Sequence, residues 1–318
     1  MIFFSHKKST FIVILILILT KKRQMEFPEN FQQWQEFFER FDNEMQNTSN
    51  YIKDKLELFQ FAADELLKQN DYQGAKNFLE KALSLTKKIN EPIAQARILN
   101  MLAQIFYAEQ NLEDALAYIE KALEIFKKHK GSESPEVIDM YNNLAIILEA
   151  AGNFDHAVKM MLENIKRVKE SKHFDELYLA TSYNNLAGIF WSKQQPQNAL
   201  EYLLKAKEIK EKKLEKDDPK LIELYNNLAL IYLSLGNLST AESYQKKSLN
   251  LIEKNNSPAH EKITALKNMA LIYEEKGLII EALDLINQAI SLLKKVFPYG
   301  HPDIEEAEKI KEQWQKKL

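Results

Sequence analysis

Apolar residues recur along most of this chain with the period of an amphipathic helix. One segment places them at Tyr141, Leu144, Ala145 and Leu148, a spacing of i, i+3, i+4 and i+7 that lines one side of a helix. The pattern predicts a helix that is buried along one side, and it returns in segment after segment.

The pattern also repeats over a longer distance. The letters YNNLA stand at residues 141–145, 183–187 and 225–229, at a constant interval of 42. Their closing alanine has counterparts at Ala63, Ala103, Ala145, Ala187, Ala229 and Ala270. A second alanine follows twelve residues after each, at Ala75, Ala115, Ala157, Ala199, Ala241 and Ala282. Because both alanines lie in apolar stripes of helical spacing, each repeat is predicted to be a pair of helices.

The repeat defines the expected domain organisation. Six helix pairs are predicted over residues 51–89, 91–130, 134–171, 174–214, 217–255 and 257–296, with a closing helix over 302–316. An aromatic face at Phe31, Trp34, Phe38, Phe41 and Met45 predicts a helix that covers the open end of the stack. We therefore expect an extension at 1–24, a capping helix at 25–50, repeats at 51–296 and a C-terminal capping helix at 297–318.

The turn inside each pair is expected seven residues after the first alanine. The residue there is Gly152, Gly236, Gly277 or, in the first pair, Asn70. Glycine, and less readily asparagine, adopts the left-handed conformation that commonly ends a helix. Gln110 and Gln194 fit that conformation poorly, so their turns are expected to close differently.

The junctions between pairs read GSESPEVIDMYNNLA, EKDDPKLIELYNNLA and FPYGHPDIEEA. These strings and the paired alanines resemble the tetratricopeptide repeat family, and the 42-residue period resembles its kinesin light chain subfamily. The resemblance covers residues 51–318 and implies an all-α fold, a right-handed superhelical solenoid of six helix pairs with a capping helix at each end. It also implies a protein that binds other proteins, without pointing to kinesin.

In such a solenoid the first helix of each pair lines a concave groove, and helical spacing identifies the face that would lie there. One column on this face is Asn143, Asn185, Asn227 and Asn268, and a second is Asn142, Asn184 and Asn226. An asparagine amide both donates and accepts, so such a column can hold the backbone of an extended peptide. A competing interpretation is that the asparagines bond the neighbouring helix and only fix the stacking of repeats.

The same face carries Trp191 and Leu230. Gly188 lies one turn from Trp191, so the missing side chain would leave a pocket beside the indole for an apolar side chain of the partner. The alternative is that Trp191 packs under the next repeat. Acidic residues outnumber cations on the inferred face, so the bound segment is expected to be extended and neutral to basic.

Composition argues against several other classes. The net charge is -3, which gives no footprint for nucleic acid, and the chain has no cysteine, which excludes disulfides and thiolate metal sites. The six histidines form no HExxH motif and no i,i+4 pair, and no glycine-rich phosphate loop occurs. We therefore expect no catalytic activity, no metal and no cofactor.

Residues 1–24 contain an apolar run from Phe11 to Leu19 between groups of lysines and arginine. As a helix the run would cover about 14 Å, against about 30 Å of bilayer hydrocarbon. No small-residue cleavage site follows it. The favoured interpretation is a working start at Met25 and a cytoplasmic protein; a membrane anchor or an export signal remains the alternative.

Two functional hypotheses follow. The first is a non-catalytic scaffold whose groove binds an extended segment of a partner protein through the asparagine columns. The second is a bacterial peptide-sensing regulator that carries a tetratricopeptide array. Such a regulator needs an effector domain ahead of the repeats, and residues 25–50 provide room for about one helix.

Overall fold

A computed structural model of the protein describes residues 28–46, 50–171, 175–298 and 300–318. Within these ranges the regular secondary structure is entirely α-helical, which confirms the predicted all-α class. The extension at 1–24, with its predicted start, anchor or signal, lies outside the described residues. No helix in the described part of the chain combines the length and the apolar character needed to cross a bilayer.

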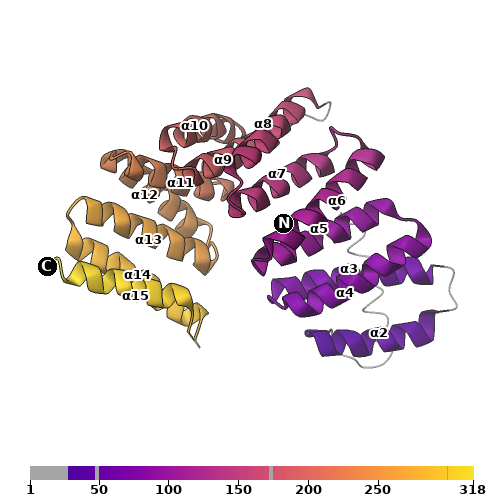
Figure 1. Ribbon diagram of the computed structural model, residues 1–318. Coiled ribbons are helices and arrows are strands. Elements are labelled where there is room, and N and C mark those ends of the chain that lie inside the picture. Colours follow the sequence, from indigo (N-terminus) through magenta and orange to yellow (C-terminus); the bar gives the residue numbers. More distant parts are fainter. Residues whose placement is uncertain (1–27, 47–49, 172–174, 299) are drawn as a thin grey trace. The chain divides into compact units, whose positions relative to one another are not determined.

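The chain divides into two compact units, Met1–Ala151 and Gly152–Leu318, and each is described by itself (Figure 1). Unit 1 contains α2 (Phe31–Met45), α3 (Tyr51–Lys68), α4 (Tyr72–Ile89), α5 (Pro92–Ala108), α6 (Leu112–Lys130) and α7 (Pro135–Ala150). Unit 2 contains α8 (Phe154–Glu170), α9 (Glu176–Ser192), α10 (Pro196–Lys213), α11 (Lys220–Ser234), α12 (Leu238–Lys254), α13 (Ala259–Glu275), α14 (Ile279–Val296) and α15 (Pro302–Gln315).

Helices that are consecutive in the chain pack against each other within each unit. In unit 1, α3 packs on α4 and α5 on α6, and α4 also contacts α5. In unit 2 the pairs are α9 with α10, α11 with α12, and α13 with α14. We call the helices that carry the first alanine of a repeat A helices (α3, α5, α7, α9, α11 and α13) and those that carry the second alanine B helices (α4, α6, α8, α10, α12 and α14). The A helices α11 and α13 also contact each other directly.

The alanine pattern lies where these helices approach most closely. Each of the alanines that carry the repeat, from Ala63 to Ala282, is at most 2% exposed. Ala229 of α11 and Ala241 of α12 share one cluster with Ile272 of α13. A methyl group at these positions lets two backbones come close, so the alanine spacing sets the packing of one pair on the next.

The turns inside the pairs correct one prediction. Gly236 has φ of 75°, and the predicted left-handed turns at Gly152, Gly277 and Asn70 are confirmed as well. Gln110 and Gln194 were expected to close their turns differently, but they adopt the same conformation, with φ of 61° and 59°. The reason is the hydrogen bonding at the helix end. The N–H of Gln194 donates to the carbonyl of Trp191 and that of Gln195 to the carbonyl of Phe190, just as Gly236 and Asn237 do in their own turn.

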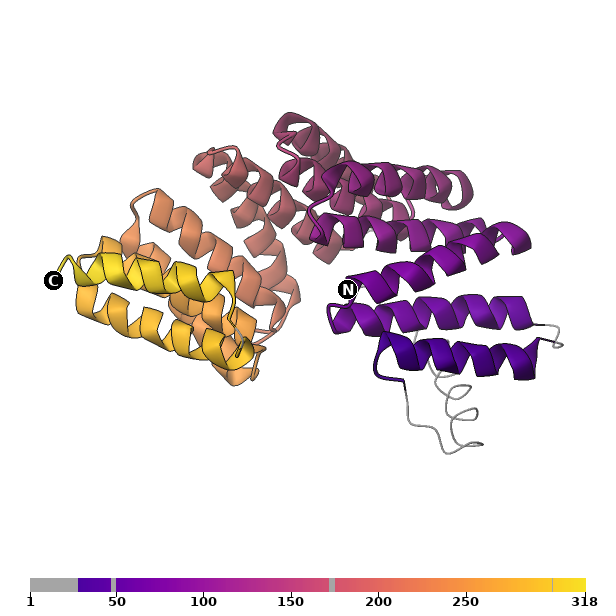
Figure 2. The same cartoon turned by 60° about the horizontal axis from the view of Figure 1, so that its bottom comes forward.

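The two end helices cover apolar surface. In unit 1, the ring of Phe38 on α2 lies 4.3 Å from that of Phe59 on α3 and 5.1 Å from that of Phe78 on α4, measured between centroids. In unit 2, α15 runs along α14 and buries Ile304, Ala307 and Trp314 (Figure 2). Each end helix therefore shields one open end of its unit from water.

Candidate functional site

The predicted site residues lie on the A helices, and the two asparagine columns differ in burial. Asn142, Asn184 and Asn226 are buried. Asn143, Asn185 and Asn227 are partly exposed, whereas Asn268, which stands in the same column, is buried. The Nδ2 atom of Asn268 has no hydrogen-bond partner among the described residues. Three members of the first column, Asn143, Asn185 and Asn227, are thus accessible to solvent, whereas the second column is buried.

Asparagines of successive A helices bond to one another. In unit 1, Nδ2 of Asn143 on α7 donates to Oδ1 of Asn100 on α5, 3.0 Å away. In unit 2, Nδ2 of Asn227 on α11 donates to Oδ1 of Asn184 on α9, 3.1 Å away. Both pairs are 43 residues apart in the chain. The second asparagine of one repeat therefore donates a hydrogen bond to the asparagine at the first position of the repeat before it.

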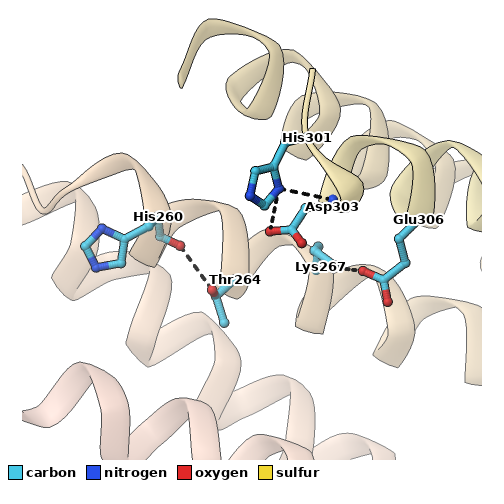
Figure 3. Close-up of polar contacts among 6 residues, drawn as sticks. All are labelled: His260, Thr264, Lys267, His301, Asp303 and Glu306. Carbon is cyan, nitrogen blue, oxygen red and sulfur yellow. Dashed lines mark hydrogen bonds and ion pairs between the residues drawn. The ribbon is translucent and has the colours of Figure 1, made fainter. Parts of the chain in front are cut away.

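A second contact joins the first asparagine position of a repeat to a glutamate 39 residues later in the chain. Nδ2 of Asn184 donates to Oε1 of Glu223, 2.9 Å away. At the equivalent place in the last repeat, Nζ of Lys267 on α13 pairs with Oε2 of Glu306 on α15 at 2.7 Å (Figure 3). We call these two contacts, together with the asparagine pairs, the inter-repeat seam.

A residue of the following B helix, α12, bonds Asn226. Its Oδ1 accepts a hydrogen bond of 2.7 Å from Nε2 of Gln245, a fully buried residue of α12. The same Nε2 lies 3.2 Å from the carbonyl oxygen of Ala265 on α13. Gln245 thus ties three consecutive helices together. Burial of this amide requires such partners, because an unpaired buried amide is costly.

The exposed side of α9, α11 and α13 forms the A-helix face of unit 2, and Trp191 is its largest apolar residue. Trp191 is 41% exposed. A Cβ atom placed on Gly188, one turn earlier, would meet no other atom within 4 Å. The positions equivalent to Gly188 hold Leu230 in α11, which is partly buried, and Leu271 in α13, which is 36% exposed. The indole therefore stands beside open space.

The charges on this face are mainly carboxylates. Glu223 and Glu275 are exposed. Glu274 pairs with Lys317, and the ammonium of Lys267 is already paired with Glu306. The charge of this face is therefore mainly negative.

A separate open pocket of about 730 Å³ lies between the end of α10, the start of α11 and the second half of α12. The hydroxyl of Tyr225 borders it and donates to Oε1 of Glu211 at 3.1 Å. Burial of the phenol, with the neighbouring charge of Glu211, raises the pKa of Tyr225 to about 12. Exposed lysines and acids ring the pocket, and no group of three or more metal-binding side chains occurs among the described residues.

Two residues that bond the repeated asparagines escaped the sequence interpretation. Asn100 stands 42 residues before Asn142 and holds the equivalent place, so a stricter use of the repeat register would have found it. Gln245 lies on a B helix, where no pattern marks a polar residue as a partner of Asn226. Local sequence carries no signal for that contact.

Comparison with known proteins agrees with this architecture. One tetratricopeptide repeat model matches residues 94–167, 178–254 and 221–295, and another matches residues 56–89. No curated protein matches the chain. Among solved structures, BtubC (BKLC) from P. vanneervenii has a TM-score of 0.60 and 21% identity, over 72% of this chain and 91% of that one.

Two further structures extend the comparison. Nearly identical TPR-like repeats of a Podosopora anserina protein assigned as a kinesin light chain give a TM-score of 0.53 and 21% identity, over 65% of this chain and 98% of that chain. The Rap conjugation gene regulator of plasmid pLS20, in complex with the Phr* peptide, gives 0.57 and 18%, over 98% of this chain and 91% of that chain. At these identities the similarity concerns the fold.

Proposed function

The chain belongs to the tetratricopeptide repeat family, whose models match more than half of it, and from this premise we propose that it is a non-catalytic scaffold that binds an extended segment of a partner protein. The observation that carries the proposal is the exposed indole of Trp191 beside the open space at Gly188. An exposed tryptophan is the kind of anchor point around which protein interfaces form.

The partly exposed asparagines would hold the backbone of the bound segment. The bond to Asn184 uses one N–H group of Asn227 and leaves its second N–H and its carbonyl oxygen for a ligand. In unit 2 we assign this role to Asn185 and Asn227; Asn268, the next member of the column, is buried. In unit 1, Asn143 has the same chemistry and the same kind of bond to its neighbour. The buried asparagines Asn142, Asn184 and Asn226 would act by positioning this column.

The side chains of the bound segment would be selected by two features. Trp191 and Leu230 offer apolar contact area, which favours an apolar side chain at that point. The surplus carboxylates of the A-helix face favour neutral or basic residues around it. Neither feature suits nucleic acid, whose phosphates these carboxylates would repel. The proposed location of the protein is the cytoplasm.

A second candidate function is peptide sensing. The observation that favours it is the similarity in fold to the Rap regulator in complex with the Phr* peptide, which extends over 98% of this chain. In that case the occupant of the A-helix face would be a free signalling peptide instead of a segment of a larger protein. The size of the captured partner separates the two candidates.

The test is affinity purification of the protein from its own cells, followed by mass spectrometry. Wild type is compared with Trp191→Ala, with the double variant Asn185→Ala and Asn227→Ala, and with Leu204→Ala as a control. Leu204 is 40% exposed but lies on the B helix α10. We expect one partner to be lost from the first two variants and kept by the control. A partner retained by all variants would refute the proposed binding face.

A further inference from the structure

The open pocket of unit 2 shares no lining residue with the proposed peptide-binding residues of the A-helix face. Its volume of about 730 Å³ falls within the range of about 300–1,000 Å³ that is typical of pockets for small molecules. Leu214, Leu221 and Leu251 line it, and the last two of these are buried. The pocket therefore offers apolar contact area to a ligand of small-molecule size.

The two carboxylates that line this pocket already have partners. Oε1 of Glu211 accepts the hydrogen bond from Tyr225, and its Oε2 lies 2.9 Å from Nζ of Lys207. The carboxylate of Asp217 forms an ion pair with Lys254. Because a cation compensates each acidic charge at close range, the two carboxylates leave room for an anion beside the remaining lysines.

Two lysines that line the pocket are not compensated in this way. Lys216 and Lys247 are exposed, and neither ammonium has an ion pair or a hydrogen bond among the residues that the structure describes. Nζ of Lys247 lies over two rings, 5.4 Å from the centroid of Tyr225 and 5.1 Å from that of Tyr244. The ring faces attract the cation, and its N–H groups remain available to an acceptor.

The preceding repeat shows the same lysine with its charge compensated. Lys205 stands 42 residues before Lys247 and also lies over two aromatic rings, the nearer at 4.5 Å. Its Nζ, however, lies 2.6 Å from Oε1 of Glu201, one turn earlier on α10. The residue equivalent to Glu201 on α12 is Ser243, which carries no charge. The pocket therefore lies at the repeat in which this lysine lacks its internal carboxylate.

We propose that this pocket binds a small organic anion, with the anionic group against the ammonium groups of Lys247 and Lys216 and an apolar body against the three leucines. A carboxylate and a phosphate both satisfy these cations, so the ligand is defined by its charge and its apolar part. The site does not depend on the proposed function, because it uses other residues and takes a ligand of the opposite charge.

The test is isothermal titration calorimetry of the full chain with octanoate, octyl phosphate and octanol. The three probes share one alkyl chain, and octanol lacks the charge. Lys247→Gln and Lys216→Gln each remove one of the open cations. Lys205→Gln is the matched control, because it removes the same charge from the same position of the preceding repeat. Melting temperatures of the variants show that each is folded.

We expect at least one of the two anions to bind in a saturable manner and about tenfold more tightly than octanol, the equivalent of about 1.4 kcal/mol. The anion that binds more tightly identifies the preferred head group. Lys247→Gln should weaken its binding about tenfold, Lys216→Gln should also weaken it, and Lys205→Gln should leave it unchanged. Added salt should weaken the binding as well, because the lysines are exposed.

Three results would each overturn the inference. They are octanol binding as tightly as both anions, neither anion binding in a saturable manner, and equal losses of affinity in Lys247→Gln and Lys205→Gln. None of these results bears on the A-helix face, which the partner purification tests separately.

Discussion

Nδ2 of Asn227 donates a hydrogen bond to Oδ1 of Asn184, although 43 residues separate them in the chain. The bond connects two A helices and recurs between Asn143 and Asn100 in unit 1. The repeated asparagine pair therefore has a role in stacking. The bond takes one N–H group of Asn227 and leaves its other N–H and its carbonyl oxygen, so stacking is compatible with the proposed contact to a ligand.

The first prediction concerns the energy of this bond. A double-mutant cycle with Asn184→Ala, Asn227→Ala and the combined variant should give a coupling free energy of about 0.5–1.5 kcal/mol. Urea unfolding followed by circular dichroism measures it. Asn184 also bonds Glu223, so its single variant should be the more destabilised of the two. Strictly additive effects would show that the bond contributes nothing to stacking.

The second prediction concerns the alanines. Ala241 is fully buried against Ala229 and Ile272, so Ala241→Leu should force the helices apart and lower the free energy of unfolding by about 1–3 kcal/mol. Lys212→Ala, at an exposed position of α10, should change it by less than about 0.5 kcal/mol. Equal melting temperatures for Ala241→Leu and wild type would contradict the packing register.

The third prediction concerns the left-handed glutamines. Gln194 has φ of 59°, a conformation that costs a residue with a Cβ atom about 1 kcal/mol. Gln194→Gly should therefore raise the free energy of unfolding by about 0.5–1 kcal/mol, even though it removes a side chain. The reverse exchange, Gly236→Ala, should lower it by about 1 kcal/mol, since Gly236 has φ of 75°. A loss of stability in Gln194→Gly would mean that its side chain stabilises the turn.

The fourth prediction concerns alkaline pH. The pKa of Tyr225 is raised to about 12 in the folded protein, against about 10 in an unfolded chain. The folded state therefore keeps this proton longer. The raised pKa therefore contributes stability that is fully present below about pH 10 and is lost as the pH rises toward 12. The free energy of unfolding falls over this range by at most about 1.4 kcal/mol per pH unit from this group.

Tyr225→Phe should remove this part of the pH dependence. Urea unfolding of wild type and variant between about pH 9 and pH 11.5 measures the difference, and lysine titration affects both proteins alike. The two stability curves should converge as the pH rises. Parallel curves over this range would show that Tyr225 titrates normally in the folded protein.

The sequence predicts the helices well because the repeat shows the pair of alanines six times. The alanine register, the pairing of helices and the glycine turns follow from residues that act within one or two turns of themselves. The prediction for the turns at Gln110 and Gln194 was wrong because the hydrogen bonds that close a helix end outweigh the preference of one residue for another conformation. A single-residue propensity could not anticipate that balance.

The candidate site is less predictable because it depends on contacts between repeats. The sequence predicts that Asn143 and Asn227 occupy equivalent positions on one helix face, but it cannot tell whether an amide points to a ligand or to the previous helix. The structure adds the partners Asn100 and Asn184. The exposure of Trp191 is likewise a property of how the neighbouring helices pack, which the sequence of α9 alone does not reveal.

The seam also has a consequence for how the chain folds. Its asparagine bonds span 43 residues, and its bonds to glutamate span 39, wherever they occur in the described units. The entropy lost in closing a loop depends on the length of the loop. Because these loops have the same length in each repeat, an added repeat loses the same entropy as the one before it. Low contact order of this kind favours fast folding by local steps. An array of this design can lengthen by gene duplication without making its ends harder to assemble than its middle.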